Sequence, residues 1–297
     1  MLRFLANLQP SRSSTVLGIS SGAIAWLQTE PSGSMSWQHH AWEPDTTGAN
    51  ANTALETMRL RLPGSSASFT ALLAPSVAQH WLQTSPAQTA SLTELHAVAR
   101  SRASVLFSQT TNIDWDISAN WQANQAFLCT GLPSHWSTAL LSLSTDHHKL
   151  KVTSPLTLIL TQFKKSLPAY GWLAVVASGV LNLLQYHDSR IISLRTVRLT
   201  KHTSSAECEV IALAEWRREM LRVQSSATQL SWLKLAPRAE RPAESALLTT
   251  IPWTPLVQIP ALPAPFIGES TDARHAVIRE ALLTAWCGNQ CDEGLRK

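Results

Sequence analysis

The hydrophobic positions of this chain group most clearly in the stretch Gly171–Leu199. Two apolar runs, Trp172–Ala177 and Val180–Tyr186, stand on either side of a short turn that contains Gly179. A polar turn then leads into Ile191–Leu199, where apolar and polar residues alternate. Short apolar runs separated by glycine-containing and polar turns are typical of β-hairpins. The pattern therefore predicts a three-stranded β-meander.

The same order of apolar runs and turns occurs near the N-terminus. Thr15–Ile19 and Ala23–Gln28 flank the turn Ser20-Ser21-Gly22. Met35–Trp42 then follows a polar segment as a third candidate strand. Since a layout that recurs about half a chain away indicates duplication, we expect two related units.

Between the two meanders, helix-like and strand-like patterns alternate, as is typical of α/β folds. The predicted helices are 53–60, 76–83, 91–107, 135–144 and 156–166, and the predicted strands are 69–74, 125–132 and 150–153. Ser91 and Glu94 fit a capping box at the start of the third of these helices.

Beyond the second meander, the pattern predicts a long helix at Ala206–Val223, a strand at Gln229–Leu235 and a closing amphipathic helix at Asp272–Cys287. Prolines recur through residues 237–265, which predicts an extended connector. We therefore expect two domains, residues 1–154 and 155–297, with the connector inside the second.

The composition indicates a folded chain and excludes several classes of protein. Of the 297 residues, 44% are hydrophobic and 15% are charged, which is ordinary for a globular protein. The net charge of +4 is spread along the chain without a nucleic-acid-binding motif. We expect no signal peptide in Met1–Leu8 and no membrane span, because the longest apolar window, Gly171–Leu184, is short and contains a turn. The four cysteines form no CxxC pair, which favours a reduced, cytoplasmic chain.

The sequence offers little of the chemistry that enzymes or metal sites need. The histidine pairs at 39–40 and 147–148 are adjacent residues, which point to opposite sides of a strand, and Cys287 and Cys291 lack further ligands nearby. No nucleophile elbow, no Ser/His/Asp spacing and no P-loop is present. We therefore predict no catalytic residue and no metal ligand.

Eight of the tryptophans form two groups according to their surroundings. Apolar neighbours predict core positions for one group, and polar neighbours make the other a set of candidate anchors for a partner. The predicted core residues are Trp81, Trp136, Trp172 and Trp286, and the candidate anchors are Trp37, Trp42, Trp115 and Trp121.

The two hairpin turns form a candidate phosphate site, because backbone amides at a turn can hold an anion. The runs VLGISSGAIAWLQ and LAVVASGVLNLLQYHDSRIISLRTVRL resemble degenerate versions of the two phosphate hairpins of the sugar-kinase, heat-shock-protein-70 and actin superfamily. The resemblance implies a vestigial cofactor site, which comprises Ser20, Ser21 and Gly22 in the first turn with Ser178 and Gly179 in the second.

More narrowly, the order of features over Val16–Leu199 resembles the actin-like proteins of type IV pilus and type II secretion assembly. These are pilus-assembly protein M, its mannose-sensitive pilus counterpart and the cytoplasmic part of secretion protein L. The shared order comprises the first hairpin, ALLAPSVAQHWLQ, ARSRASVLF, FLCTGLP with HWSTALLSL, LKVTSP, and the second hairpin with its trailing Arg195. The resemblance implies an α/β, actin-like (ribonuclease H-like) fold with two related subdomains flanking a cleft.

Departures from the family's pattern point away from catalysis. The active superfamily carries an Asp in each hairpin turn, where it positions the metal-bound phosphates. Here Ser20 or Ser21 stands in the first turn, and Ala177 or Ser178 in the second. The Gly-Gly adenosine loop of the family is replaced by the segment 236–238, Ala-Pro-Arg. The resemblance thus implies a pseudo-ATPase, with no cofactor expected and ATP as the one candidate ligand.

By resemblance, the chain is expected to be a non-catalytic cytoplasmic scaffold that is recruited to the inner-membrane face. Its partner would be the short cytosolic tail of an inner-membrane pilus or secretion assembly protein, with self-association as a further expectation. A groove between the subdomains would take a peptide through apolar anchors, with basic edges meeting acidic residues.

Two alternatives to the scaffold stay open. One is a divergent nucleotide-binding ATPase or kinase of the actin-like superfamily, in which the turns at 20–22 and 178–179 still hold phosphate through backbone amides. The other is an unrelated α/β binding module.

Overall fold

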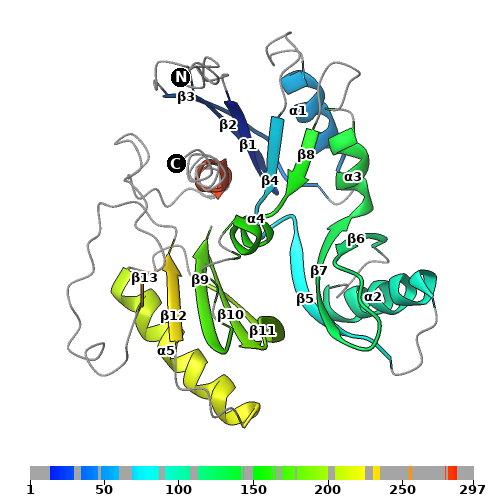
Figure 1. Cartoon of the computed structure of the whole chain (residues 1–297). Helices are drawn as coiled ribbons and strands as arrows, with labels where there is room; N and C mark the ends of the chain where they lie inside the picture. The colour runs from blue at the N-terminus through cyan, green and yellow to red at the C-terminus, as the bar shows by residue number, and fades with distance from the viewer. Residues whose placement is uncertain are drawn as a thin grey trace, which may run out of the picture.

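Two five-stranded sheets with corresponding strand orders form the framework of the computed structural model (Figure 1). The structure describes residues 14–29, 35–45, 48–59, 69–86, 91–107, 113–141, 143, 150–162, 164, 167, 169–177, 179–199, 205–224, 230–234, 254–255, 278 and 280–285. The first sheet, in the order β3-β2-β1-β4-β8, comprises β1 (Ser14–Ser20), β2 (Ala23–Thr29), β3 (Met35–Ala41), β4 (Phe69–Leu73) and β8 (Leu150–Thr153). The second, in the order β11-β10-β9-β12-β13, comprises β9 (Gly171–Ala177), β10 (Val180–His187), β11 (Arg190–Arg198), β12 (Leu230–Lys234) and β13 (Thr254–Pro255).

Each sheet consists of an antiparallel meander followed by two strands parallel to its first strand. β1, β2 and β3 form the first meander, and β4 and β8 continue that sheet in parallel. β9, β10 and β11 repeat the meander, and β12 and β13 continue the second sheet in parallel. Both meanders predicted from the sequence are therefore confirmed.

The helices cover the sheets at corresponding places. They are α1 (Ala49–Arg59), α2 (Leu92–Phe107), α3 (Ser134–Leu141), α4 (Pro155–Gln162) and α5 (Ser205–Arg222). α1 connects β3 to β4, and α5 connects β11 to β12, so the two crossovers match. α1 and α3 share a buried cluster with the first sheet, whereas α5 and α4 pack on opposite faces of the second.

A three-stranded sheet is inserted between β4 and α3. It comprises β5 (Gln79–Thr84), β6 (Trp115–Ala119) and β7 (Ala126–Pro133), in the order β5-β7-β6, and α2 packs on it. At the start of α2, the Glu94 amide donates to the Ser91 hydroxyl at 3.2 Å, as the predicted capping box requires. The edge strand β11 of the second sheet contacts both β5 and β7.

The helix predicted at 76–83 is wrong, because most of this segment is strand β5. Its side chains alternate between buried and partly exposed positions, with Trp81 and Gln83 buried and Leu82 between them. Trp81 packs with Phe107 at a ring-centroid distance of 5.6 Å, and the backbone pairs with β7. Tertiary pairing has therefore overridden a weak helical pattern.

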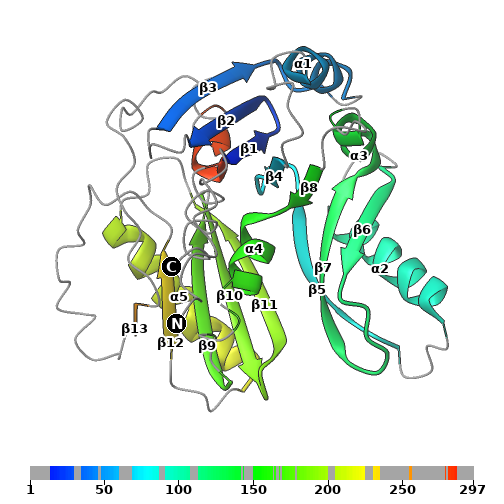
Figure 2. The same ribbon diagram turned by 45° about the horizontal axis from the view of Figure 1, so that its top comes forward.

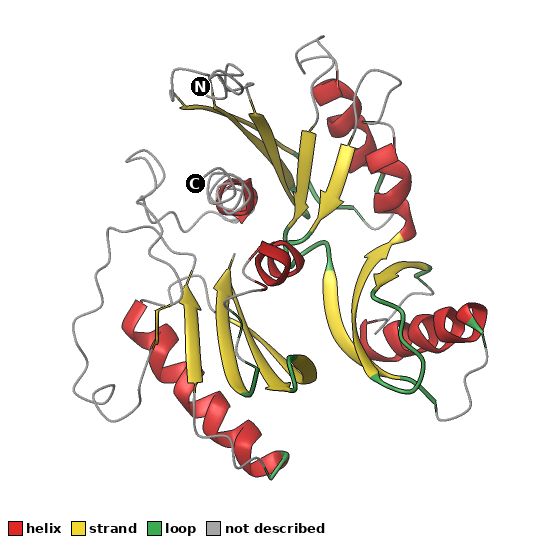
Figure 3. Ribbon diagram, viewed as in Figure 1, coloured by secondary structure: helices red, strands yellow, loops and turns green. Residues whose placement is uncertain are grey.

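The parallel strands of the two sheets point toward the middle of the molecule from opposite sides (Figure 3). In open α/β sheets, ligands bind near the carboxyl ends of the strands. The turn after β1 lies at one such end, and the turn after β9 lies at the other. A functional site is therefore expected in this middle region.

The C-terminal helical segment, residues 278 and 280–285, lies beside the first sheet although it follows the second in the chain (Figure 2). Ala281 packs with Ala23 and Ala25 of β2, and Ala285 packs with Val16 of β1. A Cβ atom added to Gly18 of β1 would overlap the Ala281 carbonyl oxygen and the Ala285 amide nitrogen. Glycine at this position is therefore what permits the helix to approach the sheet. The boundary between residues 1–154 and 155–297 stays a prediction.

We expect Gly18→Ala to destabilise the protein by about 3 kcal/mol, because the added methyl group must push the C-terminal helix off β1. Gly179→Ala is the matched control. Its φ of 75° carries a backbone cost of about 1 kcal/mol, but an added Cβ meets no atom within 4 Å. Urea unfolding of both variants measures the difference, and equal losses would contradict the proposed packing constraint.

Candidate functional site

The first predicted phosphate turn, Ser20-Ser21-Gly22, is bound to other parts of the chain. Ser20 is fully buried, and its hydroxyl donates to the Ala23 carbonyl at 3.2 Å across the turn. Gly22 is also buried, and its carbonyl accepts a hydrogen bond of 2.9 Å from the Trp42 backbone amide. The polar groups of these two residues therefore hold the hairpin itself together.

The Ser21 amide connects this hairpin to a second turn and to the C-terminal helix. It donates to the Ser76 hydroxyl oxygen at 3.1 Å, and Ser76 lies in the turn between β4 and β5. The Ser76 hydroxyl donates in turn to Oε2 of Glu280 at 2.8 Å, and the Ser76 amide donates to Oε1 at 3.3 Å. A carboxylate from residue 280 thus accepts two hydrogen bonds beside the turn where the sequence predicted a phosphate site.

The charge state of Glu280 reflects opposing effects. Burial raises the pKa of this carboxyl above its ordinary value, while the hydrogen bonds from Ser76 and the positive charge of Arg198 lower it. The net change in pKa is upward, so desolvation is only partly offset. Arg198 ends β11, which belongs to the second sheet. A positive charge from the second sheet therefore acts on a carboxylate that is held at the first sheet.

The second predicted turn differs from the first. Gly179 is exposed, and the space where a Cβ would stand is open. Its carbonyl accepts a hydrogen bond of 2.9 Å from the Leu199 amide, which joins β9–β10 to the end of β11. Ser178 and the segment 236–238 lie outside the described residues. The proposal that both turns bind a cofactor stays untested.

Glu280 is the functional candidate that the sequence interpretation missed. The superfamily pattern places an acid inside each hairpin turn, whereas this acid reaches the first turn from a helix that lies more than 200 residues after Ser76. A signal was present, because Glu280 is the one acidic residue between 273 and 287 in the predicted amphipathic helix. The pattern predicted the helix but did not predict that it packs on the first sheet.

A metal ion in a protein needs several ligating side chains that lie close together. In the part of the chain that the structure describes, no group of three or more His, Cys, Asp or Glu side chains is placed to hold an ion. The pair at 147–148 and the cysteines at 287 and 291 lie outside the described ranges. Cys129 is a buried core residue, as predicted, and burial raises its pKa to about 12.

The aromatic residues predicted as partner anchors are largely used inside the fold. Trp115 is only 3% exposed, so its prediction as an anchor is wrong, because it fills the core beneath α2 with Trp81. Trp121 stacks on His96 at a ring-centroid distance of 3.9 Å. Trp42 packs against Trp136 at 6.3 Å, and Trp37 packs beside the C-terminal helix. Trp286 lies outside the described residues.

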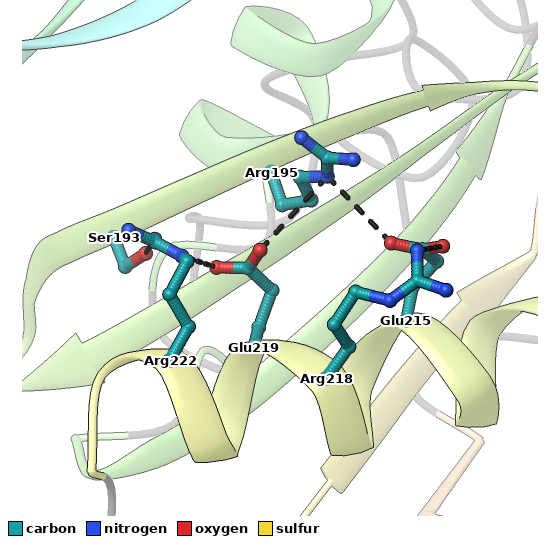
Figure 4. Close-up of polar contacts among 6 residues, drawn as sticks. All are labelled: Ser193, Arg195, Glu215, Arg218, Glu219 and Arg222. Atoms are coloured by element: carbon teal, nitrogen blue, oxygen red, sulfur yellow. Dashed lines mark hydrogen bonds and ion pairs between the residues drawn. The ribbon is translucent and has the colours of Figure 1, made fainter.

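Three arginines, one on β11 and two on α5, form an ion-pair network with two glutamates of α5 (Figure 4). Arg195 of β11 approaches Glu215 at 3.6 Å and Glu219 at 3.9 Å. On α5, Arg218 pairs with Glu215 and Arg222 with Glu219, each at 2.6 Å. The side chain of Glu219 is only 3% exposed. Two of the three positive charges in this part of the predicted basic edge are therefore balanced within the chain, and the contacts of Arg195 fasten α5 to the sheet.

We expect Arg222→Met to cost about 2 kcal/mol of stability, since it leaves the buried Glu219 with only the longer contact to Arg195. Arg218→Met is the matched control on the same helix, because its partner Glu215 is more exposed and still faces Arg195. Its expected cost is below about 1 kcal/mol. Urea unfolding measures both, and a larger loss for Arg218→Met would contradict the assigned role of Glu219.

The raised pKa of Glu280 predicts how stability depends on pH. The folded protein retains the Glu280 proton to higher pH than the unfolded chain does, so stability from the protonated form is lost as pH rises above about 4.5. The neutral variant Glu280→Gln removes this loss. The stability of the variant relative to the natural chain should therefore increase from pH 4 to pH 7.

Urea unfolding at a series of pH values tests this expectation. Glu56→Gln serves as the control, because it removes an exposed carboxylate that pairs with Arg59 on α1. A stability difference for Glu280→Gln that does not change with pH would show that this carboxyl is not buried as described.

The fold and the site can be compared with known proteins. No protein-family model matches the chain, and no curated protein matches it by sequence. Among solved structures, it is similar to the PilM-PilN type IV pilus biogenesis complex, with 12% identity and a TM-score of 0.53 over 96% of this chain and 99% of the other. The repeated strand order and this likeness over nearly the whole length confirm the predicted actin-like α/β fold.

Two further structures have lower scores. The cytoplasmic domain of EpsL, an inner-membrane component of the type II secretion system of Vibrio cholerae, has 15% identity and a TM-score of 0.45 over 91% of this chain and 95% of the other. A Bacteroides thetaiotaomicron protein of unknown function with an actin-like ATPase fold has 10% identity and a TM-score of 0.46 over 81% and 87%. The likeness to the PilM-PilN complex over nearly the whole chain confirms the resemblance stated from the sequence, as a likeness of fold. Across the described helices, none is both long and apolar enough to cross a membrane.

Proposed function

We propose that this protein is a non-catalytic scaffold of a type IV pilus or type II secretion apparatus, at the cytoplasmic face of the inner membrane. The observation that carries the proposal is the similarity to a chain of the PilM-PilN complex, which covers 96% of this chain and 99% of that one. A likeness of such extent includes both sheets and the inserted sheet, so the whole chain would serve the same kind of assembly.

The polar contacts at the first turn support a role without catalysis. Phosphoryl transfer requires an acid that positions metal-bound phosphates. Neither predicted turn supplies one, and the acid beside the first turn, Glu280, is hydrogen-bonded to Ser76. ATP is therefore not expected as a cofactor of this protein.

The proposed partner is the cytosolic tail of an inner-membrane assembly protein, and its proposed docking place is a surface cavity beside α2. The cavity, of about 510 Å³, is lined by Gln83, Ala97, Val98, Ser101, Arg102 and Val105. Val105 is 74% exposed, and the buried Oε1 of Gln83 meets no donor among the described residues. A peptide that brings an aliphatic side chain and an acidic residue would match Val105 and Arg102, which are both exposed; the Oε1 atom of Gln83 is enclosed by the chain and out of the peptide's reach.

Peptide binding tests the scaffold role and its location. Fluorescence anisotropy with labelled peptides that copy the cytosolic tails of pilus and secretion inner-membrane proteins should identify one tail that binds. Val105→Asp should weaken this binding at least tenfold, because it places a charge in an apolar contact and repels an acidic peptide. Leu221→Asp on α5, at a position 82% exposed, is the matched control and should leave binding unchanged. Absence of binding by every tail would contradict the scaffold role, and equal effects of the two variants would contradict the location.

Thermal unfolding with and without millimolar ATP and magnesium separates the scaffold from the alternative of an ATPase or kinase. A ligand that binds only the folded state raises the midpoint of unfolding. We expect no shift for the natural chain. A shift of several degrees, lost on substitution of Gly179 by a bulky residue, would favour the nucleotide-binding alternative, for which the open second turn is the supporting observation.

A further inference from the structure

The junction at the first hairpin contains donors that converge on a single acceptor group. The amide and the hydroxyl of Ser76 both donate to the Glu280 carboxylate, at 3.3 and 2.8 Å. The Ser21 amide donates to the Ser76 hydroxyl oxygen at 3.1 Å, which fixes the hydroxyl proton toward the carboxylate. Paired backbone and hydroxyl donors of this kind bind oxyanions in general, whether the oxyanion is a carboxylate or a phosphate.

A positive charge acts on the same place. The electrostatic effect of Arg198 favours the ionised form of Glu280, and Arg198 comes from β11 in the second sheet. Guanidinium groups bind phosphate and carboxylate oxygens in the same fork geometry. The positive charge of Arg198 in the second half of the molecule therefore acts on the carboxylate that the two Ser76 donors hold in the first half.

The carboxylate that accepts these hydrogen bonds and the serine that donates them belong to different elements of the fold. Glu280 belongs to the C-terminal helical segment, which contacts the first sheet through small side chains opposite Gly18. Ser76 is exposed, so a dissolved anion can reach its donors. Burial raises the pKa of Glu280 by more than its hydrogen bonds and the Arg198 charge lower it. The ionised carboxylate is therefore less stable at this place than in water.

We propose that the amide and the hydroxyl of Ser76, supported by the Ser21 amide, form a binding site for phosphate-type oxyanions to which the charge of Arg198 contributes, and that the chain's own Glu280 carboxylate fills this site. The carboxylate acts as an internal ligand that ties the C-terminal helix to the first hairpin. An external anion competes with it, and displacement loosens the end of that helix. This inference does not depend on the partner proposed above.

Removal of the internal ligand tests the site with inorganic phosphate as the probe. Calorimetric titration of the natural chain should show binding that is weak or undetectable at millimolar phosphate. Glu280→Ala should bind phosphate at least tenfold more tightly, and Glu280→Gln should fall between the two, because its amide keeps an acceptor oxygen but loses the charge. Glu56→Ala on α1, which also removes one negative charge, is the matched control and should bind like the natural chain.

Second substitutions in the Glu280→Ala background identify the donors. Ser76→Ala and Arg198→Gln should each return phosphate binding to the weak level. A Glu280→Ala variant that gains no phosphate affinity, or a gain that Ser76→Ala and Arg198→Gln leave intact, would overturn the proposal. If Glu280→Ala does not fold by circular dichroism, the same comparison is made with Glu280→Gln, whose failure to gain affinity is equally decisive.

Two sources of the phosphate group are separated in the same titration. If Glu280→Ala binds ATP with magnesium much more tightly than it binds inorganic phosphate, the site is assigned to a nucleotide. Equal affinities would assign it to the phosphate group alone, and both results retain the site.

Discussion

The close contact between the C-terminal helix and β1 is the constraint on which the arrangement at the first hairpin depends. Gly18 leaves no room for a side chain because the backbone of residues 281 and 285 occupies that space. This approach places residue 280 beside the turn between β4 and β5, where Ser76 receives its carboxylate. A chain that begins in the first sheet and passes through the second thus returns to the first. The two halves also meet where β11 contacts β5 and β7, and the charge of Arg198, at the end of β11, acts on the Glu280 carboxylate.

The polar groups in the middle of the molecule are used for structure, and this is the physical reason for proposing a scaffold. Donors that could hold a phosphate are hydrogen-bonded to Ala23, Ser76 or Glu280. Basic residues of β11 and α5 face the buried Glu219. The groups proposed to meet a partner lie on α2, with Gln83 of β5 in the inserted sheet beside them. Such a division separates the interior contacts that fix the fold from the surface proposed to meet a partner.

The sequence predicted those features of the structure that depend on residues close together in the chain. Both meanders follow from apolar runs divided at Gly22 and Gly179, and Cys129 follows from its apolar neighbours. The pattern did not predict strand β5, because Trp81 becomes buried only when the chain pairs with β7. It assigned Trp115 to a surface for the same reason, since α2 covers that residue only in the folded chain. Glu280 was missed because its partners, Ser76 and Arg198, are far away in sequence, and only the docking of the last helix on Gly18 brings them together.

The most direct measurement of the central claim is the chemical shift of the Ser76 backbone amide proton, followed by NMR from pH 3 to pH 8. If the Glu280 carboxylate accepts a hydrogen bond from this amide, the resonance must move as that carboxyl ionises, with a midpoint above the ordinary value of 4.5, and the movement must vanish in Glu280→Gln. A Ser76 resonance that does not change with pH, or that changes equally in the variant, would contradict the account.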